Sequence, residues 1–347
     1  MNPQIARTLL FGALSITKPK LLALGAGTSM AIYRHNADKL IKLANPVDLP
    51  AGTVTGITFN NKGSFLALSM DASPYVTVYV RNNFKFNKLD SVSFGLSSAS
   101  DCLAFSKDNS FMAVGTQSTP FIHMYSIVNN AFTKLSDPSD LPTGRVRSVR
   151  FSSDGVYLAC TCHGTPSSSP SIVVYKRTGT SFVKLPFSLP LADMPQGFGL
   201  ACSWSSDNKY LVVTHVDFPY MSIYKFNEFF PVKLANPASL AQSSAECVSF
   251  SPDNTYLAIG QSIYLKIYKR LGDTFTLLTG IPTFSFSTTA LVRSLCWSAD
   301  GAYLAIGVTD SPFVYVYKRN IDTFTLLPSP LVLPSGASSA ISFYPVY

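Results

Sequence analysis

The sequence predicts an all-β fold built from seven copies of a four-stranded unit, and three observations support this. Seven tyrosines recur at intervals of 44 to 50 residues, and they are Tyr33, Tyr79, Tyr125, Tyr175, Tyr224, Tyr268 and Tyr317. Glu, a common residue of helical surfaces, occurs only at Glu228 and Glu246. About 47% of the residues are hydrophobic and only 13% are charged, which favours a large core over disorder.

Each unit contains four strand-like pieces joined by short turns. In one copy the first piece ends at Phe151, and the turn at Asp154-Gly155 follows, a pair that tolerates the positive φ of tight hairpins. The second piece reads YLACT, the third contains the recurrent Tyr175, and the fourth reads FVKL. Four antiparallel strands every 44 to 50 residues is the period of a propeller blade. We therefore expect a seven-bladed β-propeller of four-stranded antiparallel blades.

The two ends of the chain predict how the ring closes. The segment ASSAISF, which ends at Phe343, matches the first strand of a unit, but no second strand follows it. Residues 21–43 supply strands two to four of the first unit. We expect the C-terminal strand to complete this blade and remove a free sheet edge. The segment ARTLLFGAL competes for the same place, so residues 1–17 are interpreted as an N-terminal strand or arm and residues 18–347 as one propeller domain.

The repeat resembles that of WD-repeat-type β-propellers over nearly the whole chain. Where that family has Trp-Asp, this chain has Tyr-Lys-Arg, as at Tyr175–Arg177, and the family's Gly-His pair is missing. The His-to-Asp network of the family therefore cannot be carried over. The phrase around Ser311–Arg319 is closer to propeller repeats of tailed-bacteriophage and bacterial proteins, which are structural or adhesive. This resemblance implies a virion component.

Residues suited to catalysis are sparse. The recurrent Asp residues are interpreted as turn formers, one per unit. Glu246 has no equivalent elsewhere in the repeat and is expected near the axial channel, where we interpret it as solvated. The chain has no Gly-x-Ser-x-Gly elbow and no Gly-rich phosphate loop before a helix. We therefore predict no catalytic residue, no cofactor and no enzymatic activity.

The strongest candidate for a metal site is Cys160, Cys162 and His163, because two cysteines two residues apart on a strand face the same side. We interpret them as buried thiols, and no metal site is predicted. The six cysteines lack the spacing of a disulfide framework, which favours free thiols in a reducing compartment.

Basic residues follow the third strands and are expected on the circumference of the ring. The formal net charge is +8. The rim either solubilises the sheet edges or binds an acidic protein surface or an anionic host-surface glycan. The candidate partner-binding residues are Arg81, Lys176, Arg177, Lys225, Lys269, Arg270, Lys318 and Arg319. The copies differ most at two segments, where the candidate loop residues are His163, Ser167, Met194 and Gln196.

These features predict a non-enzymatic binding or structural propeller, placed in a bacteriophage virion as a tail or head decoration or attachment protein. The partners would be other virion proteins or the host surface, in multiple copies, after folding in the host cytoplasm without a signal peptide. Nucleic acid is not expected, because the basic residues form no stripe, and membrane insertion is not expected, because TLLFGALSI is too short. One alternative is a cytoplasmic or cell-surface scaffold or adhesion propeller, and a third is a lactonase-like hydrolase with a site in the channel.

Overall fold

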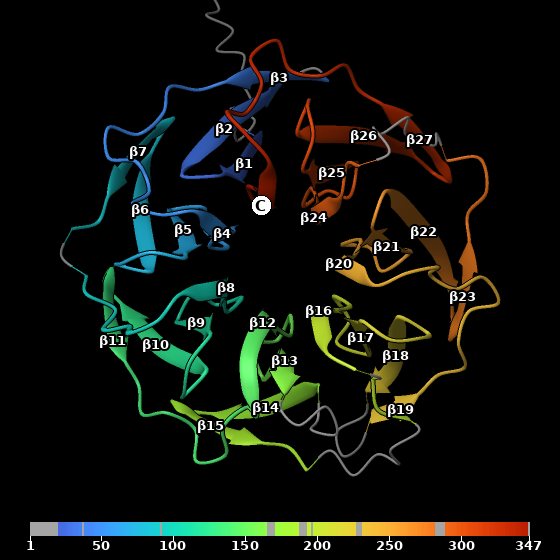
Figure 1. Ribbon diagram of the computed structural model, residues 1–347, viewed down its shortest axis with the longest axis horizontal. Helices are drawn as coiled ribbons and strands as arrows, with labels where there is room; N and C mark the ends of the chain where they lie inside the picture. The colour runs from blue at the N-terminus through green and yellow to red at the C-terminus, as the bar shows by residue number, and fades with distance from the viewer. Residues whose placement is uncertain are drawn as a thin grey trace, which may run out of the picture.

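The computed structural model describes residues 20–345, apart from residues 37, 91, 165–170, 187–192, 196, 227–230 and 282–288. The described chain forms seven four-stranded antiparallel sheets arranged as blades around a central axis (Figure 1). The predicted seven-bladed β-propeller is therefore confirmed. No helix among the residues described is long and apolar enough to cross a membrane.

Each blade runs from an innermost strand at the axis to a fourth strand at the circumference. The innermost strands are β28 (Ser338–Phe343), β4 (Val54–Phe59), β8 (Ser100–Phe105), β12 (Gly144–Phe151), β16 (Gly199–Trp204), β20 (Ala245–Phe250) and β24 (Val292–Trp297). The second strands are β1 (Lys20–Ala26), β5 (Phe65–Met70), β9 (Phe111–Thr116), β13 (Tyr157–Gly164), β17 (Tyr210–His215), β21 (Tyr256–Gln261) and β25 (Tyr303–Val308).

The outer half of each blade carries the recurrent tyrosine and the basic residues predicted for the rim. The third strands are β2 (Ser29–Asn36), β6 (Val76–Asn82), β10 (Ile122–Val128), β14 (Ile172–Thr178), β18 (Met221–Phe226), β22 (Tyr264–Leu271) and β26 (Val314–Asn320). The fourth strands are β3 (Lys39–Lys42), β7 (Lys85–Lys88), β11 (Ala131–Lys134), β15 (Ser181–Lys184), β19 (Pro231–Lys233), β23 (Thr274–Leu277) and β27 (Thr323–Leu326).

The second strands form the centre of the packing between blades. In β5, β9, β17, β21 and β25 every residue is buried. A strand buried on both faces needs apolar or small residues at every position, which explains the continuous apolar sequence of this piece. Clusters of buried side chains combine neighbouring blades, as where Val54 packs among residues of β1 and β5. The core is thus a ring of seven interfaces around the axis.

The recurrent tyrosines are buried anchors between a blade and a link on the circumference. Tyr79 is fully buried, and its hydroxyl donates to the carbonyl oxygen of Asp48 at 2.8 Å. Tyr175 donates in the same way to Asp140, also at 2.8 Å. Corresponding bonds are made by Tyr33, Tyr125, Tyr224 and Tyr268. The prediction that these tyrosines serve packing is confirmed.

The C-terminal strand closes the ring. Strand β28 pairs antiparallel with β1, with Phe343 opposite Leu22 and Ile341 opposite Leu24. Figure 1 shows the first and last described strands meeting in this blade, where β28 lies beside β1 at the axis. The predicted closure is confirmed, whereas the predicted arm at residues 1–17 lies outside the described residues.

Candidate functional site

One end of the axial channel is surrounded by seven equivalent residues, one from each blade. Each lies on an innermost strand, four residues before the aromatic residue that ends it. The seven, which we call the mouth ring, are Thr55, Asp101, Arg147, Leu200, Glu246, Arg293 and Ser339. Together with Thr53, Val54 and Arg145 they line a cavity of about 300 Å³, which is the lower end of the size range for small-molecule sites.

The mouth ring places one carboxylate between two guanidinium groups. The Oε2 atom of Glu246 lies 3.7 Å from Nη1 of Arg293 in the next blade. It lies 3.8 Å from Nη2 of Arg147, two blades away on the other side. The three side chains are 25% to 40% exposed, so solvent and solutes reach them. They form an open, charged site rather than a sealed ion pair.

A second carboxylate of the mouth ring is already neutralised. Arg145 donates from Nη2 to Oδ1 of Asp101 at 2.8 Å, and its Nε atom contacts Oδ2 of the same carboxylate. Gln117 also donates to Asp101 at 2.9 Å. This fork-to-fork pairing fixes Asp101 and Arg145 in one geometry. Three arginines against two carboxylates leave one net positive charge at the mouth, which suits an anionic ligand.

His163 lies beside the mouth, on the strand next to the innermost one. It stands opposite Arg145 in the pairing of β12 with β13, and its ring meets Phe198 edge-on with 3.6 Å between centroids. Burial and the charges of Arg147 and Arg145 lower the pKa of His163, which favours its neutral imidazole. The sequence singled out His163 as a loop residue, whereas the structure places it at the end of strand β13.

Of the other candidate loop residues only Met194 is described, and it is not among the residues that line the mouth. Met194 is half-buried in the link that precedes β16, while Ser167 and Gln196 lie outside the described residues. Cys160 and Cys162 are fully buried between blades, and burial raises the pKa of Cys162 to about 12. In the part of the chain that the structure describes, no group of three or more His, Cys, Asp and Glu residues is placed to hold a metal ion.

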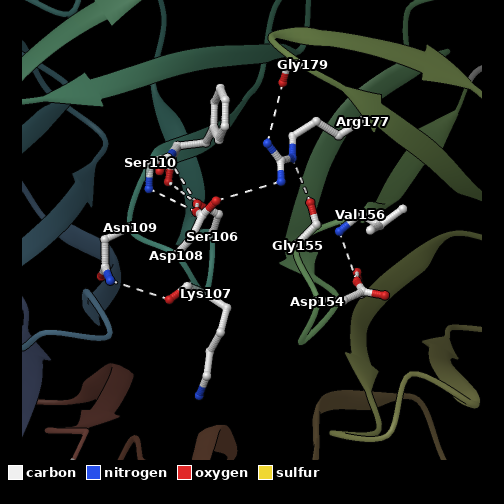
Figure 2. A network of polar contacts seen from close by, with 12 residues as sticks. Ser106, Lys107, Asp108, Asn109, Ser110, Asp154, Gly155, Val156, Arg177 and Gly179 are labelled. Atoms are coloured by element: carbon white, nitrogen blue, oxygen red, sulfur yellow. Dashed lines mark hydrogen bonds and ion pairs between the residues drawn. The ribbon is translucent and has the colours of Figure 1, made fainter.

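The arginines of the predicted rim connect neighbouring blades. Arg177 of β14 lies with its guanidinium 4.7 Å from the ring centroid of Phe111 in the preceding blade. Its Nη2 atom is 3.7 Å from Oδ2 of Asp108, and its Nε atom donates to the carbonyl oxygen of Gly155 at 2.8 Å (Figure 2). Arg270 and Arg319 repeat this arrangement on later blades. Arg81 instead contacts Tyr344, the residue after the closing strand.

The rim lysines make a second set of contacts between neighbouring blades, two of them across the interfaces of Arg270 and Arg319. Lys225, Lys269 and Lys318 form ion pairs with Asp273, Asp322 and Asp38 of the following blade, at 2.8, 2.7 and 2.6 Å. Lys176 is exposed and belongs to none of the ion pairs of the residues described. Seven of the eight predicted rim residues therefore have structural contacts. Partner binding by the rim stays a prediction.

The comparisons with known proteins establish the fold. No protein-family model matches the chain, and no curated protein matches it. Solved structures align over nearly all of it. A Bacteroides fragilis protein proposed to be a 6-phosphogluconolactonase covers 95% of this chain and 99% of its own, with TM-score 0.73 and 12% identity. The Pseudomonas aeruginosa periplasmic gluconolactonase covers 95% and 100%, with TM-score 0.70 and 16% identity. A Lactobacillus plantarum protein covers 94% and 99%, with TM-score 0.71 and 13% identity.

These comparisons correct two predictions from the sequence. The chain was expected to be a non-enzymatic virion or scaffold propeller, but three of the similar solved structures carry lactonase names. Neither the WD-repeat resemblance nor the bacteriophage resemblance is supported beyond the propeller itself. The sequence-based argument failed because it searched for local motifs, whereas a propeller assembles its site from one residue per blade. Identities of 12% to 16% establish the fold alone, so an activity has to be argued from this chain's own residues.

Of the residues at the mouth, the sequence singled out only Glu246. Asp101, Arg147 and Arg293 were missed as candidates, although each holds the same place in its unit as Glu246. The signal was available in the register: at this one position the seven copies carry four charged residues, and at the position two residues later they carry apolar side chains or cysteine. A register position that carries charged residues in four of the seven copies is the pattern that would have pointed to these residues.

Proposed function

We propose that the chain is a lactonase-like hydrolase that opens an anionic sugar lactone at the mouth ring. The observation that carries this is the placement of Glu246 between Arg147 and Arg293 in an open cavity of about 300 Å³. It offers a base and two anion-binding groups in one place. The lactonase names of the structural neighbours support the reaction class.

The charge of the mouth favours a substrate that carries a phosphate or carboxylate. One net positive charge remains after the pairing of Arg145 with Asp101, and the guanidinium groups of Arg147 and Arg293 both belong to the mouth ring. A phosphorylated lactone matches this charge, and 6-phosphogluconolactone is the substrate in the names of two neighbours. Hydroxyl groups of Thr55 and Ser339 line the same cavity and suit the hydroxyls of a sugar.

The reaction needs one water molecule and no redox partner. Glu246 takes a proton from the water, whose oxygen adds to the lactone carbonyl carbon. One of the two arginines stabilises the negative charge that develops on the carbonyl oxygen, while the other holds the substrate anion. The tetrahedral intermediate then expels the ring oxygen, and the protonated Glu246 returns the proton to it. The product is the open hydroxy acid, and Glu246 is regenerated.

The test is a ring-opening assay with 6-phosphogluconolactone, followed by acid release at constant pH and corrected for spontaneous hydrolysis. The unmodified protein is expected to accelerate opening, and Glu246→Gln to lower kcat by about 100-fold or more, because general-base catalysis contributes about that factor. Asp273→Asn removes a carboxylate from the circumference instead and serves as the matched control, with activity retained.

An unmodified protein that leaves the spontaneous rate unchanged would contradict the proposal. So would a Glu246→Gln variant that folds normally and keeps full activity. Thermal unfolding of each variant separates a lost chemical step from a lost fold, because Glu246 is partly exposed and its removal leaves the core intact.

A further inference from the structure

The channel has a second cavity at its other end, opposite the mouth ring. It is lined by the ends of the innermost strands, by turn residues such as Asn61 and Pro252, and by Pro345 beyond β28, and it encloses about 330 Å³. A narrower space of about 130 Å³ connects the two ends and touches residues of both. Arg150 lines the second cavity and the connecting space, and it is exposed to them.

Arg150 differs from the other arginines of the innermost strands. Arg145, Arg147 and Arg293 each lie within ion-pair distance of a carboxylate. In the described part of the chain, Arg150 forms no ion pair, and its Nη1 atom donates to the carbonyl oxygen of the adjacent Val149 at 2.9 Å. A guanidinium has five donor hydrogens, so most of the donor capacity of Arg150 is available to a ligand.

The residues equivalent to Arg150 in the other blades are small, and most carry a hydrogen-bonding group. They hold the same position in their blades, one residue before the terminal aromatic, and are Thr58, Ala104, Ser203, Ser249, Cys296 and Ser342. Thr58, Ser249 and Ser342 line the second cavity. Within the described part of the chain, their hydroxyls donate only to the carbonyl of the next residue, at 3.2, 3.3 and 3.4 Å. These are long bonds for a hydroxyl donor, so a bound acceptor would compete for these hydrogens.

The equivalent residues of the other six blades have small side chains, so the long side chain of Arg150 meets no equally long one at this position across the channel. Burial raises the pKa of Cys102, Cys202 and Cys296, and the charge of Arg150 opposes this effect at all three. The three thiols belong to β8, β16 and β24, which lie on different sides of the axis (Figure 1). The positive charge of Arg150 therefore acts on thiols in three blades, as expected for a group near the axis.

We propose that this second cavity is a binding site for a small oxyanion, such as inorganic phosphate or the phosphate group of a metabolite, held by Arg150 and the surrounding hydroxyls. The planar guanidinium donates two parallel hydrogen bonds to such a group, and hydroxyls on three other blades supply further donors. The site is separate from the mouth ring and does not depend on the proposed hydrolase activity.

Titration with inorganic phosphate at constant ionic strength tests this site, with the fluorescence of Trp297 as the reporter. Trp297 lines the second cavity, and the only other tryptophan is Trp204, so a Trp204→Phe background isolates the signal. Saturable binding is expected, weakened about tenfold or more in Arg150→Gln and partly restored in Arg150→Lys. Glucose 6-phosphate is expected to bind as well, and glucose alone is not.

The matched control is the double variant Arg147→Gln/Arg293→Gln, which removes the anion-binding groups of the mouth ring. It is expected to keep the Trp297 response, which separates the two sites. Absence of saturable phosphate binding in the unmodified protein would overturn the proposal. Binding that persists in a folded Arg150→Gln variant, or that disappears only in the mouth variant, would also overturn it. If Trp297 is insensitive to the ligand, calorimetric titration measures phosphate binding instead. The heat of phosphate binding is then expected to be smaller in Arg150→Gln than in the unmodified protein.

Discussion

Arg319 of strand β26 lies 2.8 Å from the carboxylate of Asp253 in the preceding blade, with its guanidinium 5.0 Å from the ring centroid of Tyr256. The same triad of arginine, turn aspartate and strand aromatic occurs with Arg177 and Arg270. These contacts hold adjacent blades together at three interfaces.

We predict that Arg319→Ala lowers the free energy of unfolding by about 2 kcal/mol, because a stacked cation and a charge-assisted contact are lost together. Urea denaturation measures the change. Arg319→Lys should recover only part of the loss, since lysine lacks the planar group that stacks. The control is Lys176→Ala on the exposed circumference, which should change stability by no more than about 0.5 kcal/mol. Equal effects of the alanine variants would refute this role of Arg319.

The same contacts make stability depend on pH. Partial burial raises the pKa of Asp253, but hydrogen bonds from Arg319 and Ser251 outweigh it, so the folded-state pKa lies below the ordinary value of 3.8. A carboxyl with a lowered folded-state pKa stabilises the fold above its unfolded pKa, and this stability is lost as the pH falls through the folded pKa. The urea midpoint should therefore fall below about pH 4. It should fall less steeply in Arg319→Ala, and parallel profiles would count against the coupling.

The buried tyrosine anchors give a further prediction. Tyr79→Phe removes only the hydroxyl that donates to the carbonyl oxygen of Asp48, so it should lower the free energy of unfolding by about 1 kcal/mol. Tyr264 is half exposed on β22, and Tyr264→Phe is the matched control. Thermal or urea unfolding compares the two variants. No difference between them would show that the hydroxyl contributes nothing to the anchor.

Ring closure by β28 predicts that removing residues 338–347 sharply destabilises the protein. The deletion exposes the edge of β1 and the core side chains that Ile341 and Phe343 cover. A synthetic peptide of residues 338–345 added in trans is expected to raise the melting temperature of the truncated protein by refilling the edge. A truncated protein that melts within about a degree of the full chain would contradict closure by this strand.

The sequence was sufficient for the architecture because a propeller repeats its local signals seven times. The spacing of the tyrosines, the Asp turns and the unpaired strand ending at Phe343 each predicted a feature that the structure contains. The rim residues show what the sequence could not predict. Lys225 and Arg270 were correctly placed on the outer strands, but their partners Asp273 and Asp207 come from other blades, and no local pattern reports such pairs.

The mouth ring was hidden for the same reason. Glu246, Arg147 and Arg293 are 47 to 146 residues apart in the chain and meet only because the ring closes. A scan for catalytic motifs depends on residues that are close in sequence, so it found one isolated glutamate and interpreted it as solvated. Alignment of the seven units by register, rather than by similarity, brings the three residues into one column.

The two arginines of the mouth also predict substrate selectivity. In Arg293→Gln, KM for a phosphorylated lactone should rise about tenfold, with a much smaller change for the unphosphorylated lactone, because only the former loses a charge-assisted contact. Steady-state kinetics with both substrates measures the ratio. Lys176→Ala, which alters charge on the circumference, should leave it unchanged. A similar change of KM for both lactones would argue against anion recognition by Arg293.

The measurement that tests the central claim most directly is the rate at which the unmodified protein and its Glu246→Gln variant open 6-phosphogluconolactone at neutral pH. The account predicts clear acceleration over the spontaneous reaction by the unmodified protein and a loss of about 100-fold or more in kcat for the variant, with equal melting temperatures. Spontaneous rates with both proteins, or equal acceleration by both, would contradict it.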